Sequence, residues 1–166
     1  MMVVNLRPAR PADAPTIAEI YNQGIEDREA TLETERRSAE ERLRWLTGRD
    51  SKHPVIVAEV EGVVTGWGSL NVFNSRPAYD HVADFSVYVG RGYRGKGVGS
   101  ALLRELLGIA HELGYHKLVL TAFPWNRGGL ALYGKFGFRV VGTYREQGRL
   151  DGKWVDTILM EKIVDR

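Results

Sequence analysis

A glycine-rich stretch between an apolar, strand-like segment and an amphipathic segment constrains this chain most. Residues 86–103 read SVYVGRGYRGKGVGSALL, and three phosphate-loop patterns fit parts of this stretch. One is G-x-G-x-x-G from Gly90, another is the first seven positions of G-x-x-x-x-G-K-[ST], and the third is R-x-x-G-x-G from Arg94. All three place backbone N–H groups and a helix N-terminus against phosphate. The surrounding residues decide between them.

The first two patterns lack the partners that their chemistry needs. A dinucleotide fingerprint expects an acidic residue about twenty positions later, at the end of the next strand, to hold the ribose. The segment that ends this strand, LVLTAF, contains no acid. A P-loop needs a hydroxyl after its lysine to bind magnesium, whereas Gly97 follows Lys96. The third pattern is favoured, with a tight strand–helix turn as the alternative.

The favoured pattern also accounts for the glycines and the charges of the loop. Gly95, Gly97 and Gly99 carry no side chain that would keep a pyrophosphate from the backbone N–H groups. Arg94 and Lys96 add positive charge. We therefore expect a pyrophosphate-binding loop that leads into a helix.

Hydrophobic periodicity predicts a mixed α/β fold. Strands are expected at 2–6, 53–60, 63–73, 80–89, 116–123, 138–147 and 153–164. Helices are expected at 11–25, 38–46, 97–114 and 126–137, with a polar loop at 28–37. This order predicts one domain over 1–166, with a twisted sheet of about seven strands flanked by about four helices. The sheet should be antiparallel at its ends and parallel in the middle.

Composition and charge exclude several classes of function. The absence of cysteine excludes disulfides and cysteine nucleophiles and favours a reducing compartment. A net charge of +2, with its basic cluster in the glycine loop, argues against nucleic acid. No apolar run is long enough for a membrane span or a signal peptide, so we expect a cytoplasmic protein. His111 and His116 are five residues apart, which does not fit the H-E-x-x-H pattern, and no metal is expected.

Two segments resemble the GCN5-related N-acetyltransferase (GNAT) superfamily. In that superfamily, R-x-x-G-x-G or R-x-x-G-x-A between a strand and a helix is the acetyl-CoA loop. Residues 126–138, NRGGLALYGKFGF, resemble its N-x-x-A-x-x-L-Y-x-K-x-G-F segment. The predicted order of elements is similar to this fold along nearly the whole chain. Gly128 and Gly129 stand where helix formers are usual, which predicts a helix whose first turn frays or starts late.

Three further segments narrow the resemblance. The segment SRPAYDHVADFSVYV, together with IYNQGIED and GKWVD, is similar to the phosphinothricin and methionine sulfoximine acetyltransferases. In this subfamily the position of Asp84 is usually a glutamate, one methylene longer. The resemblance implies transfer of acetyl from acetyl-CoA to the primary amine of a small amino-acid-like acceptor, in a homodimer. The alternatives are acetylation of a protein N-terminus or lysine, and an acyl-CoA-binding sensor without turnover.

The reaction so implied needs a base and an acid. Amines have pKa values of about 8 to 10.5, so the acceptor is mostly protonated at neutral pH and must lose a proton. Strand alternation places Asp84, Ser86 and Tyr88 on one face, which makes Asp84 the candidate base. A structural carboxylate is the alternative. The resemblance implies that Tyr133 protonates the departing thiolate, whereas a tyrosine that only packs against the sheet is the other interpretation.

The resemblance also implies the binding residues. The oxyanion and the pantetheine amides would meet backbone groups near the end of the strand at 80–89. The expected cofactor contacts are Val87, Tyr88, Val89, Arg94, Gly95, Lys96, Gly97, Val98, Gly99, Ser100, Asn126 and Tyr133. The expected acceptor contacts are Thr31, Arg76, Tyr79 and Asp84. Asn126 could instead cap its helix, and Arg76 could be a solvated surface arginine.

Overall fold

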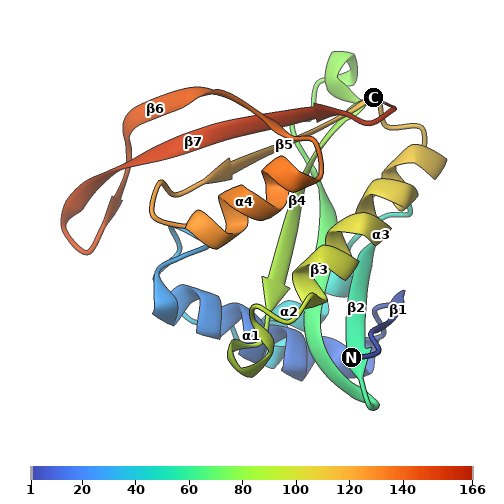
Figure 1. The fold of residues 1–166 in the computed structure, drawn as a ribbon. Helices are drawn as coiled ribbons and strands as arrows, with labels where there is room; N and C mark the ends of the chain where they lie inside the picture. The colour runs from blue at the N-terminus through green and yellow to red at the C-terminus, as the bar shows by residue number, and fades with distance from the viewer. Residues whose placement is uncertain (1, 166) are drawn as a thin grey trace.

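A seven-stranded sheet with helices on both faces forms the body of the computed structural model, which describes residues 2–165 (Figure 1). The strands are β1 (Asn5–Pro8), β2 (Val55–Val60), β3 (Val63–Val72), β4 (Val82–Val89), β5 (Lys117–Ala122), β6 (Arg139–Leu150) and β7 (Lys153–Ile163). The helices are α1 (Ala14–Asp27), α2 (Ala39–Thr47), α3 (Val98–Glu112) and α4 (Arg127–Lys135). Short 3-10 turns are η1 (Pro11–Asp13), η2 (Pro77–Tyr79) and η3 (Arg91–Tyr93). The predicted order of elements is confirmed.

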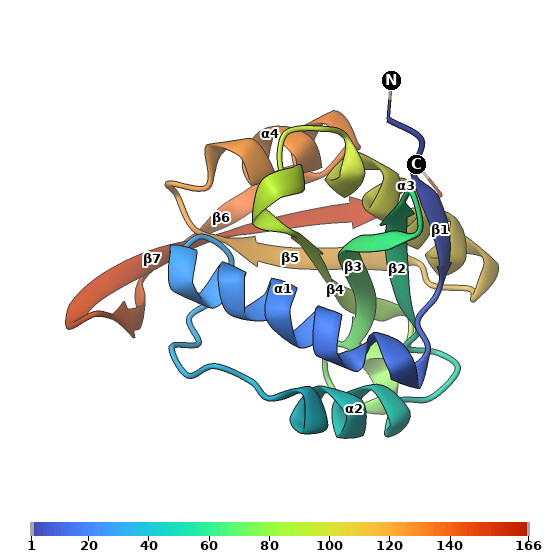
Figure 2. The same ribbon diagram turned by 90° about the horizontal axis from the view of Figure 1, so that it is seen from below.

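The sheet has the strand order β1-β2-β3-β4-β5-β7-β6. All neighbouring strands are antiparallel except β4 and β5, which confirms the predicted parallel middle. Viewed along the sheet, α1 and α2 lie on one face, and α3 and α4 lie on the other (Figure 2). The parallel pair is short, because β4 and β5 are paired only from Val82–Lys117 to Asp84–Val119.

Two strand boundaries differ from the sequence prediction. The strand expected at residues 2–6 lies at Asn5–Pro8, where an edge position tolerates a proline that has no N–H to donate. The strand expected to end at residue 147 continues to Leu150, because two register shifts against β7 lengthen it. Asp151 and Gly152 both have positive φ, at 51° and 79°, as the predicted hairpin turn requires.

Helix α3 packs unusually close to β3 because two glycines of that strand face it. The helix buries Val98, Leu102, Leu103, Leu106 and Ala110. A Cβ built on Gly68 would lie 2.9 Å from Cδ1 of Leu106 and 3.1 Å from the backbone oxygen of Ser86. A Cβ on Gly66 would lie 3.0 Å from the backbone oxygen of Tyr88. Because these two positions have no side chain, α3 can lie closer to the sheet than a larger residue would allow.

We expect Gly68→Ala to destabilise the protein by about 1–3 kcal/mol, because the added methyl group forces α3 away from the sheet. Urea unfolding followed by circular dichroism measures this. Gly108→Ala is the matched control, since an exposed α3 glycine with nothing within 4 Å of a built Cβ should become slightly more stable as alanine. Equal midpoints for the two variants would contradict the close approach.

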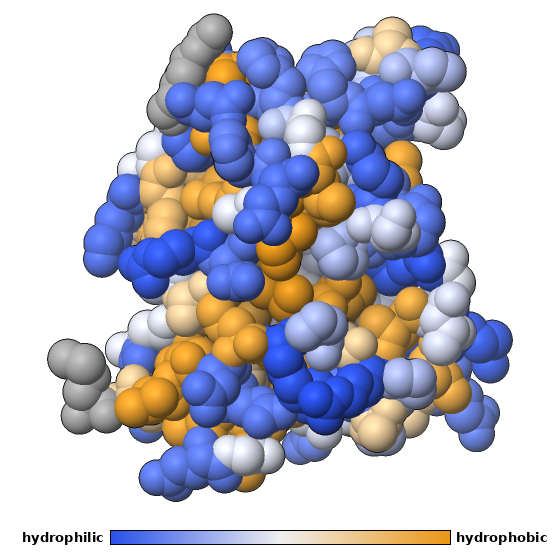
Figure 3. All heavy atoms as spheres, turned by 90° about the vertical axis from the view of Figure 1, so that its right-hand side faces the viewer, coloured by the Kyte–Doolittle hydropathy of each residue, from blue (hydrophilic) through white to orange (hydrophobic). Residues whose placement is uncertain are grey.

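The other face of the sheet has its own hydrophobic cluster. Helix α1 buries Ile17, Ile20, Tyr21 and Ile25, which recur at the helical spacing of three and four residues, against Trp67 of β3. Figure 3, which views the molecule from the side where α3 lies, shows mainly hydrophilic projecting side chains with hydrophobic atoms in the recesses between them. Within residues 2–165, no helix has both the length and the apolar character needed to cross a bilayer.

Candidate active site

The glycine loop between β4 and α3 has a backbone that only glycine adopts without strain. Gly95 and Gly97 have φ values of 73° and 90°, and Gly97 is the residue immediately before α3. A Cβ built on either residue meets nothing within 4 Å, so these glycines are not needed for internal packing. They keep the outer side of the loop open, as an anion that approaches backbone N–H groups and the start of a helix requires.

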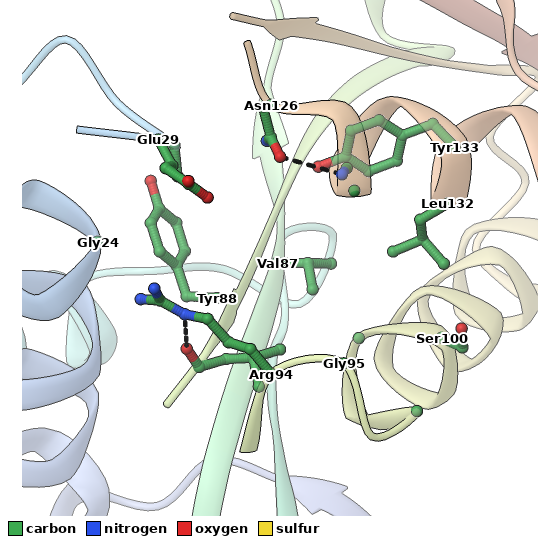
Figure 4. A pocket seen from close by; sticks show the side chains of 16 residues that line it. Gly24, Glu29, Val87, Tyr88, Arg94, Gly95, Ser100, Asn126, Leu132 and Tyr133 are labelled. Carbon is green, nitrogen blue, oxygen red and sulfur yellow. Dashed lines mark hydrogen bonds between the residues drawn. The ribbon is translucent and has the colours of Figure 1, made fainter. Parts of the chain in front are cut away.

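A cavity of about 460 Å³ lies between this loop, the end of β4, α1 and α4 (Figure 4). Ten of the predicted cofactor residues line it, namely Val87, Tyr88, Val89, Arg94, Gly95, Gly97, Gly99, Ser100, Asn126 and Tyr133. Lys96 and Val98 do not line it, because Lys96 is exposed elsewhere on the loop and Val98 is fully buried in the core. The side chain of Val87 points toward α4, and that of Tyr88 points the other way, toward α1 (Figure 4).

The separation of β4 from β5 leaves backbone groups free beside this cavity. The ladder between the two strands ends at Asp84–Val119, whereas β4 stays paired with β3 as far as Val89. Beyond this last pair, the backbone groups of Val87 directed toward β5 have no partner on that strand, and a buried backbone group needs one. The carbonyl of Val89 accepts from Arg94 Nε at 3.2 Å instead of from a strand. An extended ligand that carries amides can pair there like an additional strand.

Asn126 caps α4 and also lines the cavity, so the cap leaves its predicted cofactor contact possible. Its side-chain oxygen accepts a hydrogen bond from the backbone N–H of Gly129 at 3.0 Å, and it also lines the cavity. A Cβ on Gly129 would lie 2.5 Å from Asn126 Nδ2, so a larger residue at this position would displace the capping side chain. Helix α4 begins at Arg127, directly after its cap, so the expectation of a late start is wrong because the Asn126 side chain satisfies the first turn.

Tyr133 approaches the strand gap from the α4 side. Its ring packs edge-on against Phe85, with ring centroids 5.8 Å apart. Burial, and secondarily the negative charge of Asp84, raise the pKa of the phenol. The hydroxyl group therefore stays protonated at neutral pH and can donate a hydrogen bond or a proton.

The side chain of Asp84 lies on the face of β4 opposite to Tyr133. Asp84 and Val119 form the last pair before β4 and β5 separate. Burial raises the pKa of its carboxyl group to about 6, while a hydrogen bond from Asn71 lowers it in part. The group is thus mostly ionised at neutral pH and able to accept a proton. Asp84 does not line the 460 Å³ cavity itself, and it lies three residues before Val87, which does. The Asp84 carboxylate and the Tyr133 phenol thus lie on opposite sides of the gap between β4 and β5.

The predicted acceptor residues lie in two places. Thr31 lines a smaller cavity of about 160 Å³, which shares Ala30 with the larger one. Arg76 and Tyr79 are exposed around η2, before the start of β4, whereas the larger cavity lies at the end of that strand. The structure does not bring these two residues to either cavity, so their role stays a prediction.

The basic side chains of the loop contact α1. Arg91 and Arg94 both bond the carboxylate of Asp27, at 2.9 Å and 2.6 Å, and these arginines lower the pKa of Asp27. Arg94 also donates from Nε to the backbone oxygen of Val89 at 3.2 Å (Figure 4). Residues 2–165 contain no group of three or more histidine or acidic side chains arranged to hold a metal ion.

Sequence reasoning missed six residues that line the larger cavity. They are Gly24, Glu29, Ala30, Gly128, Gly129 and Leu132. A Cβ on Gly24 would lie 3.0 Å from the Tyr88 ring, so this glycine lets the aromatic side chain pack against α1. Gly24 is the second-last residue of the helix expected at 11–25, where glycine is an ordinary sign of a helix end, so no signal in the sequence pointed to the close approach.

Comparisons with known proteins agree with this geometry. A model of the Acetyltransferase (GNAT) family matches residues 17–138. YwnH of Bacillus subtilis (strain 168), provisionally named a phosphinothricin acetyltransferase, is 40% identical over 154 residues, which cover 92% of this chain and 94% of YwnH. MnaT of Escherichia coli (strain K12), named an L-amino acid N-acyltransferase, is 34% identical over 163 residues, which cover 98% of this chain and 95% of MnaT.

A solved structure agrees along nearly the whole chain. The phosphinothricin acetyltransferase of Sinorhizobium meliloti in complex with acetyl-CoA is 33% identical and has a TM-score of 0.89. The match covers 98% of this chain and 89% of that one. The family model spans well over half of the present sequence, and it includes the glycine loop and α4. The chain belongs to the acetyltransferase (GNAT) family.

Proposed function

We propose that this protein transfers the acetyl group of acetyl-CoA to the primary amine of a small amino-acid-like acceptor of the phosphinothricin or methionine sulfoximine type, by direct attack on the thioester. One observation carries the proposal. The glycine loop, the unpaired side of β4 and the Tyr133 phenol line one cavity, and the Asp84 carboxylate lies beside the same strand gap. This arrangement supplies an anion site, amide partners, an acid and a base in sequence along one path.

The cavity fits the parts of acetyl-CoA. The open backbone at Gly95 and Gly97 suits the pyrophosphate, and the backbone of Val87, which has no partner on β5, suits the amides of the pantetheine arm. When bound, acetyl-CoA supplies the thioester that the amine attacks. A backbone N–H near Val87 would hold the oxyanion, as preorganised donors do in acyl transfer.

The two ionisable groups have protonation states suited to their proposed roles. Asp84, ionised above about pH 6, accepts the proton of the acceptor amine directly or through a water molecule. Tyr133, held protonated, donates to the sulfur that leaves. Since the two groups lie on opposite sides of the strand gap, the proton is taken from the amine on one side of the reacting carbon and is given to the sulfur on the other.

The neighbouring cavity supports a small acceptor. Its volume is about 160 Å³, and its polar side chains are the threonines Thr31, Thr121 and Thr157, with no charged residue. The names of YwnH and MnaT, which refer to phosphinothricin and to L-amino acids, support the same class of acceptor. Arg76 and Tyr79 stay in the proposed set of acceptor contacts, and the guanidinium of Arg76 suits a carboxylate, but both residues lie outside the two cavities and would have to approach an acceptor from η2.

The homodimer and the cytoplasmic location belong to the proposal as well. A set of exposed apolar side chains on β6 and β7 supports a homodimer through these strands: Val140, Val141, Tyr144 and Trp154. Side chains of this size, gathered on one hairpin, usually mark a contact surface. The lack of cysteine supports a reducing compartment.

A thiol-release assay tests the function. The protein is given acetyl-CoA and, separately, phosphinothricin, methionine sulfoximine, a panel of L-amino acids and short peptides with a free N-terminus or lysine. We expect the release of free thiol with phosphinothricin, with methionine sulfoximine or with an L-amino acid. Release only with peptides would replace the proposal by protein acetylation. Acetyl-CoA binding without release in any mixture would replace it by a sensor.

We expect Gly97→Val to weaken acetyl-CoA binding by about tenfold or more. The loop must return to a φ of 90° to bind, and this conformation costs a non-glycine residue about 1–3 kcal/mol. Isothermal titration calorimetry measures the affinity. Gly92→Val is the matched control, because Gly92 lies in η3 without positive φ and with nothing within 4 Å of a built Cβ. Equal affinities of the two variants would overturn the role given to the loop.

A further inference from the structure

Asn71 of β3 lies directly opposite Asp84 of β4, and its side-chain amide makes all of its possible hydrogen bonds. In the register of β3 and β4, Asn71 pairs with Asp84, and Ser69 pairs with Ser86. The side-chain amide of Asn71 donates from Nδ2 to Asp84 Oδ1 at 3.2 Å and to Ser86 Oγ at 3.0 Å. Its oxygen accepts from Ser69 Oγ and from Arg49 Nη2, both at 2.9 Å. All four hydrogen-bonding positions of the amide are used.

The donors on the oxygen side fix the orientation of the amide. Arg49 can only donate, so the group that it contacts must be the Asn71 oxygen, and the NH₂ group must then face Asp84. Arg49 is itself held, since its Nε donates to the backbone oxygen of His53 at 2.9 Å and its guanidinium stacks 4.6 Å from the Trp45 ring. Ser69 is fully buried. Asn71 therefore cannot turn its oxygen toward the carboxylate without losing two partners.

We propose that Asn71 is a positioning residue for Asp84: its NH₂ group, locked by Arg49 and Ser69, holds the carboxylate at the strand gap and favours its ionised form. The inference deepens the proposed function and rests on the role of Asp84 as the base. Asn71 has no contact with either cavity and acts only through Asp84. Burial raises the pKa of a carboxyl group, and a fixed hydrogen-bond donor beside the carboxylate offsets part of this rise.

The other charged groups around Asp84 are few. Tyr133 of α4 lies close enough for the charge of Asp84 to raise its pKa. On β5, Lys117 lies two residues from Val119, the partner of Asp84, and is paired with Glu161 at 2.6 Å. From the α1 and α2 side, Arg49 reaches Asp84 only through Asn71. The direct polar contact of Asp84 among the described residues is therefore Asn71.

The test uses Asn71→Asp, which keeps the size of the side chain and its acceptors for Arg49 and Ser69 but replaces the NH₂ donor by a carboxylate oxygen. The pH dependence of kcat/KM is measured with the acceptor that the wild-type protein turns over best. Below about pH 6, both Asp84 and the amine must lose protons, so log kcat/KM should rise with a slope of about two, and above that pH with a slope of about one. We expect Asn71→Ala to move this break upward by about one pH unit, and Asn71→Asp to move it further.

A second measurement does not depend on turnover. Carboxyl ¹³C NMR follows the titration of Asp84 in the protein without ligands, with Asp84→Asn for assignment. We expect its midpoint to move upward in the same order, wild type, Asn71→Ala, Asn71→Asp. Asn5→Asp, the same change at an exposed position of β1, is the control and should leave both the midpoint and the break in place.

The two readouts separate the inference from the proposed function. A midpoint that does not move in Asn71→Asp overturns the inference, whatever the activity. A midpoint that moves while the kinetic break stays overturns Asp84 as the base and leaves Asn71 as its positioning partner. A lower rate at every pH with no shift in either readout would show a merely structural role, which also overturns the inference.

Discussion

Asp84→Asn should lower kcat/KM by about 10²–10⁴-fold while the affinity for acetyl-CoA changes little, because a general base contributes rate in this range and Asp84 lies outside the cofactor cavity. The loss should be largest between about pH 6 and 7.5. There the wild-type carboxylate is ionised, whereas the acceptor amine is still mostly protonated. Steady-state kinetics across this range, with calorimetry for acetyl-CoA, measure both quantities.

The asparagine at position 84 keeps the shape of the site. Its side-chain oxygen can still accept from Asn71, so a large loss reports the missing proton acceptor and not a disordered strand. The break near pH 6 should disappear in the variant. Asp84→Glu restores a carboxylate with one more methylene and should recover part of the rate. A variant that follows the wild-type pH profile would remove Asp84 from the proton transfer.

Tyr133→Phe should lower kcat by about 10–100-fold and change the acetyl-CoA affinity by less than about threefold. The ring and its edge-on contact with Phe85 remain, so only the hydroxyl donor is lost. Without that donor the thiolate, whose parent thiol has a pKa of about 8.5, leaves unprotonated. Single-turnover and steady-state rates, with calorimetry, separate the chemical step from binding.

Tyr144→Phe is the matched control for that change. Tyr144 is half exposed on β6 and lines neither cavity, so loss of its hydroxyl should leave kcat unchanged. If Tyr133→Phe also leaves kcat unchanged, another group protonates the sulfur. A fall in acetyl-CoA affinity equal to the fall in kcat would make Tyr133 a binding residue alone.

Local chemistry made most of the fold and the glycine loop predictable. Positive φ at Gly95 and Gly97 follows from the pattern of glycines before a helix, and the resemblance to the GNAT superfamily drawn from that pattern is confirmed. The helix expected at 38–46 depends on the same kind of local signal, because Ser38 caps α2 by accepting from the Glu41 N–H at 3.1 Å, and a serine three residues before a glutamate is typical of a helix start. These features depend on neighbours within a few residues, so the sequence alone carries them.

Features that depend on register could not be predicted in the same way. Asn71 lies opposite Asp84 only because β3 and β4 pair in one particular register. No residue in these two strands indicates this register from the sequence alone. The position of Val98 in the core depends on how far α3 is turned, so its place in the glycine motif did not show that its side chain is buried and lies away from the cavity. The place where β4 leaves β5 is also set by packing over the whole sheet.

The early parting of β4 and β5 gives this sheet an edge in its interior. Sheet edges are where strands of other molecules attach, and proteins normally blunt or cover them. If acetyl-CoA binds as proposed, a permanent cover is impossible, because the same backbone groups must remain open to the coenzyme. A coenzyme lying in the gap would then serve as a removable guard against aggregation, so that its depletion would threaten the solubility of the chain as well as its turnover.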